Sequence, residues 1–248
     1  HAEQIKRIWK ESLGRYGVRK VWQQLKREGY VIARCTVARL MQKLGIQGVW
    51  RGKNKQTTRS RDDQKRADDL VKRNFNADHP DQLWVADFTY IQTHSGWVYT
   101  AFIIDVFSRA IVGWKVSTRM NTDMVLDALE QALHDRGMPK NVIHHSDRGV
   151  QYLSIRYTNR LEAANLRASV GTTGDSYDNA LAETVNGLYK TEVIEYLKAD
   201  WQGLADVQLA TLNWVDWFNK ERVHSALGYV SPFEFEAMYY DKINPLGQ

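Results

Sequence analysis

The sequence contains a single cysteine, Cys35, and has no long apolar run. One cysteine excludes an internal disulfide and any zinc module built from several cysteines. No apolar run approaches the ~20 residues that span a bilayer, and no signal-peptide pattern opens the chain, so we expect a cytoplasmic protein. The first residue is His1 rather than Met, which indicates a trimmed chain or part of a longer polypeptide.

The charge is unevenly distributed along the 248 residues. Residues 1–80 contain 20 Lys and Arg against 8 Asp and Glu, a net charge of +12. The remaining residues contain 14 against 21, a net charge of −7. Binding of a basic segment to a phosphate backbone is favourable because it releases counterions. The basic N-terminal third therefore indicates a nucleic-acid partner. Surface acids explain most of the acidic excess, and a metal site would account for some of it.

Residues 15–46 carry the pattern of two helices around a short turn, and we assign residues 1–48 to a small all-α helix-turn-helix domain. The first helix is predicted over residues 18–28, and the second begins near Thr36, a suitable N-cap. Apolar residues recur at helical spacing in the second helix: Val37, Leu40, Met41 and Leu44. A second helix of this kind enters the major groove of DNA in known helix-turn-helix proteins.

The opposite face of the second helix supplies candidate DNA contacts, namely Arg39, Gln42 and Lys43. A helical hairpin with ordinary solvated charges is the alternative, and the basic surroundings favour DNA contact. Residues 49–80 read as a basic linker followed by a short helix over about 63–75. Further basic candidates lie in the first helix and in the linker: Arg19, Lys20, Arg51, Lys53 and Lys55.

From Leu83 onwards the pattern changes to strands and helices. Short connections between the first three strands predict antiparallel hairpins, and a helical crossover makes the fourth strand parallel to its neighbour. The predicted elements are strands over 83–92, 97–107 and 109–116, a helix over 121–136 with Asn121 as its N-cap, a strand over 142–146, a helix over about 154–165 and a strand over 167–170. This order predicts an α/β ribonuclease H-like mixed sheet flanked by helices, over residues 81–240.

Three acidic residues stand in positions where acids are uncommon. Asp87 lies inside the strand-like run WVADFTY, and aspartate is depleted in strands. Asp147 ends a short apolar run, at the carboxyl edge of a strand, where ligand sites of open α/β sheets gather. Glu183 lies near the start of a predicted helix with Asp178 as its N-cap. Most acids are solvated surface residues, so these positions only slightly favour a shared site.

Three convergent carboxylates without a cysteine or histidine partner would form an all-oxygen site. Such a site suits Mg²⁺ or Mn²⁺. A pair of these ions can support an in-line attack on a phosphodiester. The residues therefore point to an enzyme that cuts and joins DNA strands.

The segments around these acids match a known family. WVADFTYI, HSDRGVQY and GDSYDNALAETVNGLYKTEVI resemble the catalytic core of the insertion sequence three family of bacterial transposases, in the retroviral-integrase superfamily. WFNKERVHSALGYVSPFEFE resembles the closing segment of that family. GRYGVRKVWQQLKREG and CTVARLMQKLGI are similar to its second helix-turn-helix region. The resemblance covers nearly the whole chain.

The resemblance implies a triad of Asp87, Asp147 and Glu183 that binds two Mg²⁺ ions, for which Mn²⁺ can substitute. It implies cleavage at the ends of an insertion sequence and transfer of a 3′ end to target DNA, through a figure-eight and a circular intermediate. The implied partners are the terminal inverted repeats, the target DNA and at least a second copy of the chain, at the bacterial nucleoid. Family members usually carry a further N-terminal region.

Lys190 follows Glu183 by seven residues, which returns it to the same face of a helix. The resemblance implies that Lys190 contacts the phosphate beside the reacting end, whereas an isolated lysine would read as a solvated one. Asn179 and Asn186 share roughly that face and are weaker candidates for DNA contact. Tyr177 would stack on a base or pack against the protein.

Other conspicuous residues favour structural roles. His144 and His145 are expected beside the strand end rather than as metal ligands. Ser231 and Pro232 read as an N-cap and first residue of a short helix. Four apolar residues are expected in the core against the sheet: Leu209, Leu212, Trp217 and Phe218. Arg222 and His224 are weak candidates for DNA contact.

Two other functions fit part of the sequence. A DNA-binding repressor or domesticated factor would keep the fold without catalysis, and the intact acidic triad argues against it. A ribonuclease H-type nuclease would cut without joining, and the basic helix-turn-helix domain argues against that.

Overall fold

A computed structural model describes residues 1–50, 76–147, 149–170, 180–197 and 200–244. The predicted helix over 63–75, the predicted cap Asp178 and five candidate DNA contacts lie outside these residues. Those candidates are Arg51, Lys53, Lys55, Tyr177 and Asn179.

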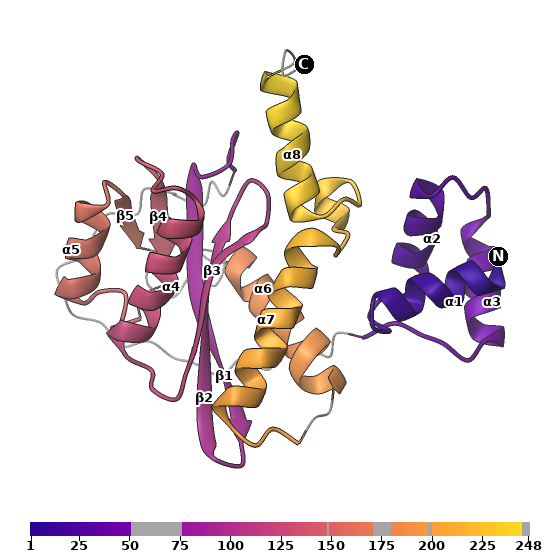
Figure 1. The fold of residues 1–248 in the computed structure, drawn as a ribbon, viewed down its shortest axis with the longest axis horizontal. Coiled ribbons are helices and arrows are strands. Elements are labelled where there is room, and N and C mark those ends of the chain that lie inside the picture. The colour runs from indigo at the N-terminus through magenta and orange to yellow at the C-terminus, as the bar shows by residue number, and fades with distance from the viewer. Residues whose placement is uncertain (51–75, 148, 171–179, 198–199, 245–248) are drawn as a thin grey trace.

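The N-terminal domain contains three helices, at the right of Figure 1: α1 (Ala2–Glu11), α2 (Val18–Arg27) and α3 (Arg34–Lys43). The predicted pair corresponds to α2 and α3. Helix α1 was missed, although Ile5 and Ile8 are three residues apart and both are buried. The prediction of Thr36 as an N-cap is wrong, because α3 begins at Arg34 after an extended Ala33.

In the described residues that follow the N-terminal domain, the strands form a five-stranded sheet with the order β3-β2-β1-β4-β5. Its strands are β1 (Leu83–Thr93), β2 (Gly96–Asp105), β3 (Ile111–Ser117), β4 (Ile143–Ser146) and β5 (Arg167–Val170). Strands β1 to β3 pair antiparallel, whereas β4 pairs parallel with both β1 and β5. The predicted ribonuclease H-like mixed sheet is confirmed.

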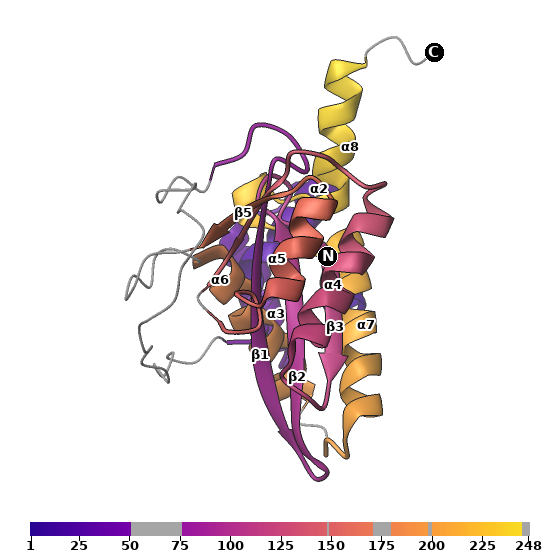
Figure 2. The ribbon, with the colours of Figure 1, turned by 90° about the vertical axis from the view of Figure 1, so that its left-hand side faces the viewer.

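Helices cover both faces of the sheet (Figures 1 and 2). On one face lie α4 (Thr122–Asp135) and α5 (Ile155–Ala163), which pack with Trp84 and Ala86 of β1. On the other lie α6 (Ala180–Tyr189), the π-helix η1 (Lys190–Glu195) and α7 (Leu204–Lys220), which pack with Leu83 and Val85. The alternation of side chains along β1 therefore builds two separate cores.

The absence of a side chain at Gly113 lets α4 pack closely on β3. A Cβ atom added at Gly113 of β3 would lie 2.2 Å from the carbonyl oxygen of Ala128. The predicted N-cap at the start of α4 is also confirmed, because the Asn121 side chain accepts a hydrogen bond from the Met124 N–H at 3.2 Å. Strand β3 and helix α4 are thus fixed by close packing and by a cap.

The C-terminal segment comprises α7, the short 3₁₀ helix η2 (Ser225–Leu227) and α8 (Pro232–Ile243), which Ser231 caps as predicted. Trp217 and Phe218 of α7 are buried in the core. The prediction that Leu209 and Leu212 are also core residues is wrong, since they are 60% and 50% exposed. Only one face of α7 reaches the sheet, and the other lies on the surface.

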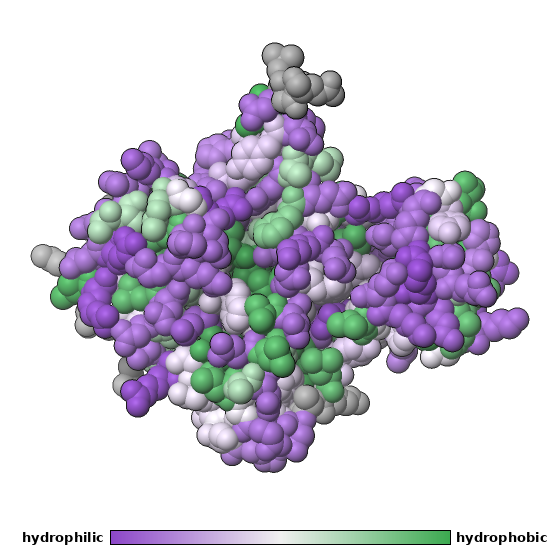
Figure 3. Space-filling view, in the orientation of Figure 1, coloured by the Kyte–Doolittle hydropathy of each residue, from purple (hydrophilic) through white to green (hydrophobic). Residues whose placement is uncertain are grey.

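Figure 3 shows apolar surface over α7 and beside it. Leu212 lies there in an open groove of about 230 Å³ whose lining includes Trp114 and Phe233. Within the described ranges, no helix is long and apolar enough to cross a membrane.

Candidate active site

The sheet brings the two aspartates of the predicted triad together. In the parallel pairing of β1 with β4, Ala86 is opposite Ser146. Asp87 and Asp147 follow these residues directly, so their backbones lie side by side where β4 ends. This is the carboxyl edge of the parallel strands, where the sequence placed the site.

Asp87 is partly buried, and two hydrogen-bond donors and two nearby charges act on its carboxylate. One oxygen accepts the N–H of Phe88 at 2.8 Å, and the other accepts the Nδ2–H of Asn186 at 2.8 Å. Burial, followed by the charge of Asp147 and that of Glu183, raises the pKa of Asp87 to about 8. The like charges of the other two acids therefore reach Asp87, so the three side chains share one electrostatic environment.

The other two acids are more accessible. Asp147 is exposed, and one of its oxygens accepts the N–H of Gly149 at 2.9 Å. The surrounding protein still limits its hydration and raises its pKa above the usual value. Glu183 is exposed in the first turn of α6, where partial burial raises its pKa. Carboxylates in the first turn of a helix are favoured by the helix dipole.

Asn186 lies one turn after Glu183 on α6. Its position on the helix made it a candidate for DNA contact. The structure instead shows that Asn186 is buried and that its amide donates a hydrogen bond to Asp87. Sequence reasoning missed this role because the partner is 99 residues away along the chain. The hydrogen bond fixes the orientation of the Asp87 carboxylate relative to the helix that carries Glu183.

Lys190 begins η1, and its ammonium lies over the ring of Tyr90 at 4.8 Å. Tyr90 makes an edge-to-face contact with Trp97, with ring centroids 5.3 Å apart. Both aromatic residues are exposed on the β1–β2 hairpin, so the lysine lies in an accessible position. The predicted face of the helix is therefore turned towards the strand that carries Asp87.

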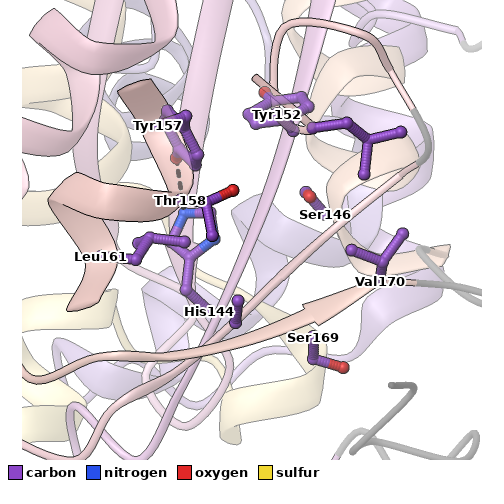
Figure 4. A pocket seen from close by; sticks show the side chains of 10 residues that line it. His144, Ser146, Tyr152, Tyr157, Thr158, Leu161, Ser169 and Val170 are labelled. Atoms are coloured by element: carbon purple, nitrogen blue, oxygen red, sulfur yellow. Dashed lines mark hydrogen bonds between the residues drawn. The ribbon is translucent and has the colours of Figure 1, made fainter. Parts of the chain in front are cut away.

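The two histidines before Asp147 are structural, as predicted. Both are buried, and the Nδ1 atom of His145 is 2.9 Å from the hydroxyl of Ser169. Burial lowers the pKa of His144 to about 4, so this side chain is neutral at physiological pH. Figure 4 shows His144 beside a cavity of about 110 Å³, with its Nε2 atom 3.0 Å from the hydroxyl of Tyr157.

The remaining candidates divide into exposed and buried groups. Arg19, Arg39, Gln42 and Lys43 are exposed on the N-terminal domain. Lys20 instead lies over the ring of Tyr16 at 4.9 Å, and burial lowers its pKa to about 7. The prediction that Arg222 and His224 face DNA is wrong.

Arg222 and His224 are buried because they belong to an internal cluster. Both are less than 10% exposed, and Arg222 forms an ion pair with Glu192. Burial and the charge of Arg222 lower the pKa of His224 to about 2, so it is neutral. Basic composition alone does not distinguish an arginine that pairs with an internal acid from one that faces DNA.

The donor set suits a hard divalent cation, because every candidate ligand is a carboxylate oxygen. Among the residues described, no group of three or more histidine, cysteine or acidic side chains is gathered closely enough to hold a metal ion as it stands. Burial raises the pKa of Asp87, and repulsion from the charges of Asp147 and Glu183 adds to this effect. A divalent cation would remove this repulsion, so the residues fit such an ion.

Family models match almost the entire described chain. An HTH-like domain matches residues 1–54, and integrase core domain models match residues 77–176 and 164–232. A transposase for insertion sequence element IS629 from Shigella sonnei is 56% identical over 241 residues, which cover 97% of this chain and 80% of the relative. The chain belongs to the insertion sequence transposases.

More distant members of this transposase family are also similar over most of their length. A putative transposase for element IS986/IS6110 from Mycobacterium tuberculosis is 52% identical, over 96% of this chain and 87% of the relative. The transposase InsF for insertion sequence IS3A from Escherichia coli is 34% identical, over 91% and 78%. The expected relationship to the insertion sequence three family is confirmed.

Solved structures support the fold of this transposase. The HTLV-2 integrase catalytic core domain in complex with magnesium aligns with a TM-score of 0.52 and 18% identity, over 65% of this chain and 99% of that one. A chain of the simian T-cell lymphotropic virus intasome in complex with PP2A regulatory subunit B56 gamma aligns with a TM-score of 0.55 and 14% identity, over 89% and 70%. The shared feature is the integrase fold.

Proposed function

We propose that this chain cleaves DNA at the ends of an insertion sequence and joins the freed 3′ ends to target DNA. The observation that carries the proposal is the parallel pairing of β1 with β4, after which Asp87 and Asp147 follow side by side. Glu183 acts on the same carboxylate from helix α6. The names of the similar transposases support this reaction over simple hydrolysis.

Asp87, Asp147 and Glu183 would hold two Mg²⁺ ions, or Mn²⁺ in their place. When bound, such ions lower the pKa of the attacking water or 3′-hydroxyl and stabilise charge on the leaving 3′ oxygen. The support within this chain is the all-oxygen donor set and the electrostatic strain on Asp87. The magnesium complex of the HTLV-2 integrase core is a further support.

The other residues of the site orient the acids and the DNA. Asn186 holds one oxygen of Asp87, and the N–H of Gly149 holds one oxygen of Asp147. Lys190 would bind the phosphate next to the reacting end, because its ammonium lies on the same helix and above the accessible Tyr90. None of these residues needs to act as a proton acceptor.

We assign recognition of the terminal inverted repeats to residues 1–48 and catalysis to residues 81–240, joined by the basic segment 49–80. Arg39, Gln42 and Lys43 form the exposed face of α3 that would enter the major groove. Two ends of one element must meet for the reaction, so we propose at least a homodimer on DNA. With chromosomal DNA as its substrate, the protein would act at the nucleoid.

The substitution Asp147→Asn tests the proposal. It keeps the shape of the side chain and removes its charge, so strand transfer in Mg²⁺ should fall by about a thousandfold or more, while binding to element ends stays within about twofold. Asp123→Asn is the control, because Asp123 is an exposed acid that pairs with Arg156 away from the triad. Joining by Asp147→Asn at the rate of the control would refute the mechanism.

A non-catalytic repressor would give a different result in the same experiment. Neither substitution would alter its binding to DNA, and the unsubstituted protein would form no joined product with Mg²⁺ or Mn²⁺. A nuclease would release cleaved ends without joining them. The joined product therefore separates the three functions.

A further inference from the structure

The helix that carries Glu183 does not end where α6 ends. It continues without a break into η1, a six-residue π-helix over Lys190–Glu195. π-helical turns are rare and occur frequently at functional sites. Because the two segments are continuous, a shift of η1 along or around its axis also moves Glu183, Asn186 and Lys190.

A buried ion pair fixes η1 against the C-terminal part of the chain. The carboxylate of Glu192 accepts hydrogen bonds from Nη2 of Arg222 at 2.6 Å and from Nε1 of Trp214 at 3.1 Å. Glu192 is 6% exposed and Arg222 is 5% exposed, so the pair is shielded from water. Removal of one partner from a buried ion pair leaves an uncompensated charge and is strongly destabilising, so this contact holds η1 in place.

The N-terminal domain contacts the same residue from the other side. Nε of Arg15 donates a hydrogen bond to the main-chain carbonyl of Glu192 at 3.1 Å. The guanidinium of Arg15 also lies 4.6 Å from the centre of the Trp217 ring. Arg15 lies between α1 and α2, so the recognition domain reaches the catalytic helix through one buried side chain.

A second contact joins the same two regions beside Arg222. The hydroxyl of Tyr16 accepts the N–H of Val223 at 2.8 Å and donates to the carbonyl of Glu221 at 3.3 Å. The N-terminal domain therefore holds both sides of the Glu192–Arg222 pair, one through Arg15 and one through Tyr16. The side chains of Arg15, Tyr16, Glu192 and Arg222 are all buried, and none of them belongs to the acidic triad.

We propose that Arg15 and Glu192 are positioning residues that set the register of the catalytic helix, so that docking of the N-terminal domain holds Glu183, Asn186 and Lys190 in place for strand transfer. The inference rests on the proposed function. A misplacement of about 1 Å at a reacting group can cost about a hundredfold in rate, so a small shift of η1 is sufficient. Binding of DNA ends by the exposed face of α3 does not depend on this contact.

The test compares two arginines that join the N-terminal domain to the rest of the chain. Arg15→Met removes the hydrogen bond to η1 and keeps an apolar side chain over Trp217. Arg27→Ala is the matched control, because Arg27 binds the carbonyl of Tyr229 at 2.5 Å and the carboxylate of Glu234 at 2.7 Å, both outside η1. Joining of element ends is measured at saturating DNA over a range of Mg²⁺ concentrations, and thermal unfolding is measured for each full-length variant.

For Arg15→Met we expect kcat to fall about tenfold, KM for DNA ends to change by less than about twofold, and the half-maximal Mg²⁺ concentration to rise several-fold. For Arg27→Ala we expect all three quantities within about twofold of the unsubstituted protein. An unchanged kcat in Arg15→Met, or equal losses in both variants, would overturn the proposal. A loss of Tm alone, with kcat retained, would mean that the contact is only structural.

Two further results keep the test decisive. If Arg15→Met does not fold, Trp214→Phe replaces it, since this change removes the donor to Glu192 and keeps an aromatic ring. The same fall in kcat is expected, and a normal kcat overturns the proposal.

If the unsubstituted protein forms no joined product in Mg²⁺ or Mn²⁺, the proposed function fails. If it joins DNA and Arg15→Met joins equally fast, only the positioning role fails.

Discussion

At the scale of single residues, Asp87 occupies a position that is unfavourable without a cation. Its carboxylate is partly buried, and the charges of Asp147 and Glu183 add to the penalty, which is why its pKa rises to about 8. Hydrogen bonds from Phe88 and Asn186 offset only part of this cost. Strain of this kind is expected where residues are arranged for a bound ligand rather than for stability.

Asp87→Asn should therefore stabilise the metal-free protein while it abolishes strand transfer. Above pH 8 the native carboxylate is charged, and the amide removes both its desolvation and its repulsion from the other acids. We expect a higher Tm for the variant in chelator, and a rise of Tm with Mg²⁺ only in the unsubstituted protein. Thermal unfolding with and without Mg²⁺ measures both effects. A lower Tm of the variant in chelator would contradict this account of Asp87.

Asn186→Ala should reduce strand transfer by about 10–100-fold, the usual effect of losing a residue that orients a metal ligand. The hydrogen bond to Asp87 is lost, whereas the exposed surface is unchanged because Asn186 is buried. Thr184→Ala on the same helix is the control, because Thr184 is exposed and its hydroxyl donates a hydrogen bond to the carbonyl of Ala180. Equal joining rates for the two variants, measured at several Mg²⁺ concentrations, would exclude an orienting role for Asn186.

At the scale of elements, two helices divide the proposed work. Helix α3 exposes Arg39, Gln42 and Lys43 and buries Val37 and Met41 against the rest of its domain. Helix α6 packs on β1 and carries Glu183 and Asn186. The exposed face of α3 can therefore change without disturbing either core.

Arg39→Ala should weaken binding to the terminal repeats without a change in metal affinity. Loss of one phosphate contact should reduce the slope of log K against log salt by about 1, and loss of a base contact should cost about 1–3 kcal/mol. Arg156→Ala is the control, because Arg156 is an exposed arginine of the core paired with Asp123. Footprinting and binding isotherms at several salt concentrations make the comparison. Unchanged footprints for Arg39→Ala would refute the recognition-helix assignment.

At the scale of the whole molecule, the basic N-terminal domain is joined to the core through buried charges. Burial raises the pKa of Glu192 and the charge of Arg222 lowers it, and the net result is a pKa below the usual 4.5. Arg15 and Tyr16 extend this cluster across the boundary between the domains. The boundary is therefore held by specific hydrogen bonds as well as by apolar packing.

This arrangement predicts a loss of stability in acid. A carboxyl group with a lowered folded-state pKa stabilises the fold above its ordinary pKa, and that contribution disappears as the pH falls through the folded value. Glu192→Met combined with Arg222→Met removes both charges and should be nearly neutral at pH 7. Urea denaturation should show the unsubstituted protein losing stability relative to this double variant between about pH 5 and pH 3. A difference that does not change with pH would contradict the ion-pair account.

The sequence predicted the elements well and their contacts less well. Strand β5 was predicted at its observed limits, and the predicted caps at Asn121 and Ser231 are present. These features depend on local rules of periodicity and capping. The prediction that Leu209 is buried was wrong, because the spacing of apolar residues does not determine which face of a long helix packs against the sheet.

The sequence by itself determined the order of the strands and the family, because both depend on local patterns of residues, and it predicted the three acids as a site. Only the tertiary structure decided what those acids touch. It joined Asp87 to Asn186 and enclosed Arg222 with Glu192, pairs 99 and 30 residues apart. Such pairings arise because a buried polar group needs a hydrogen-bonding partner, and the fold alone determines which partner is within reach.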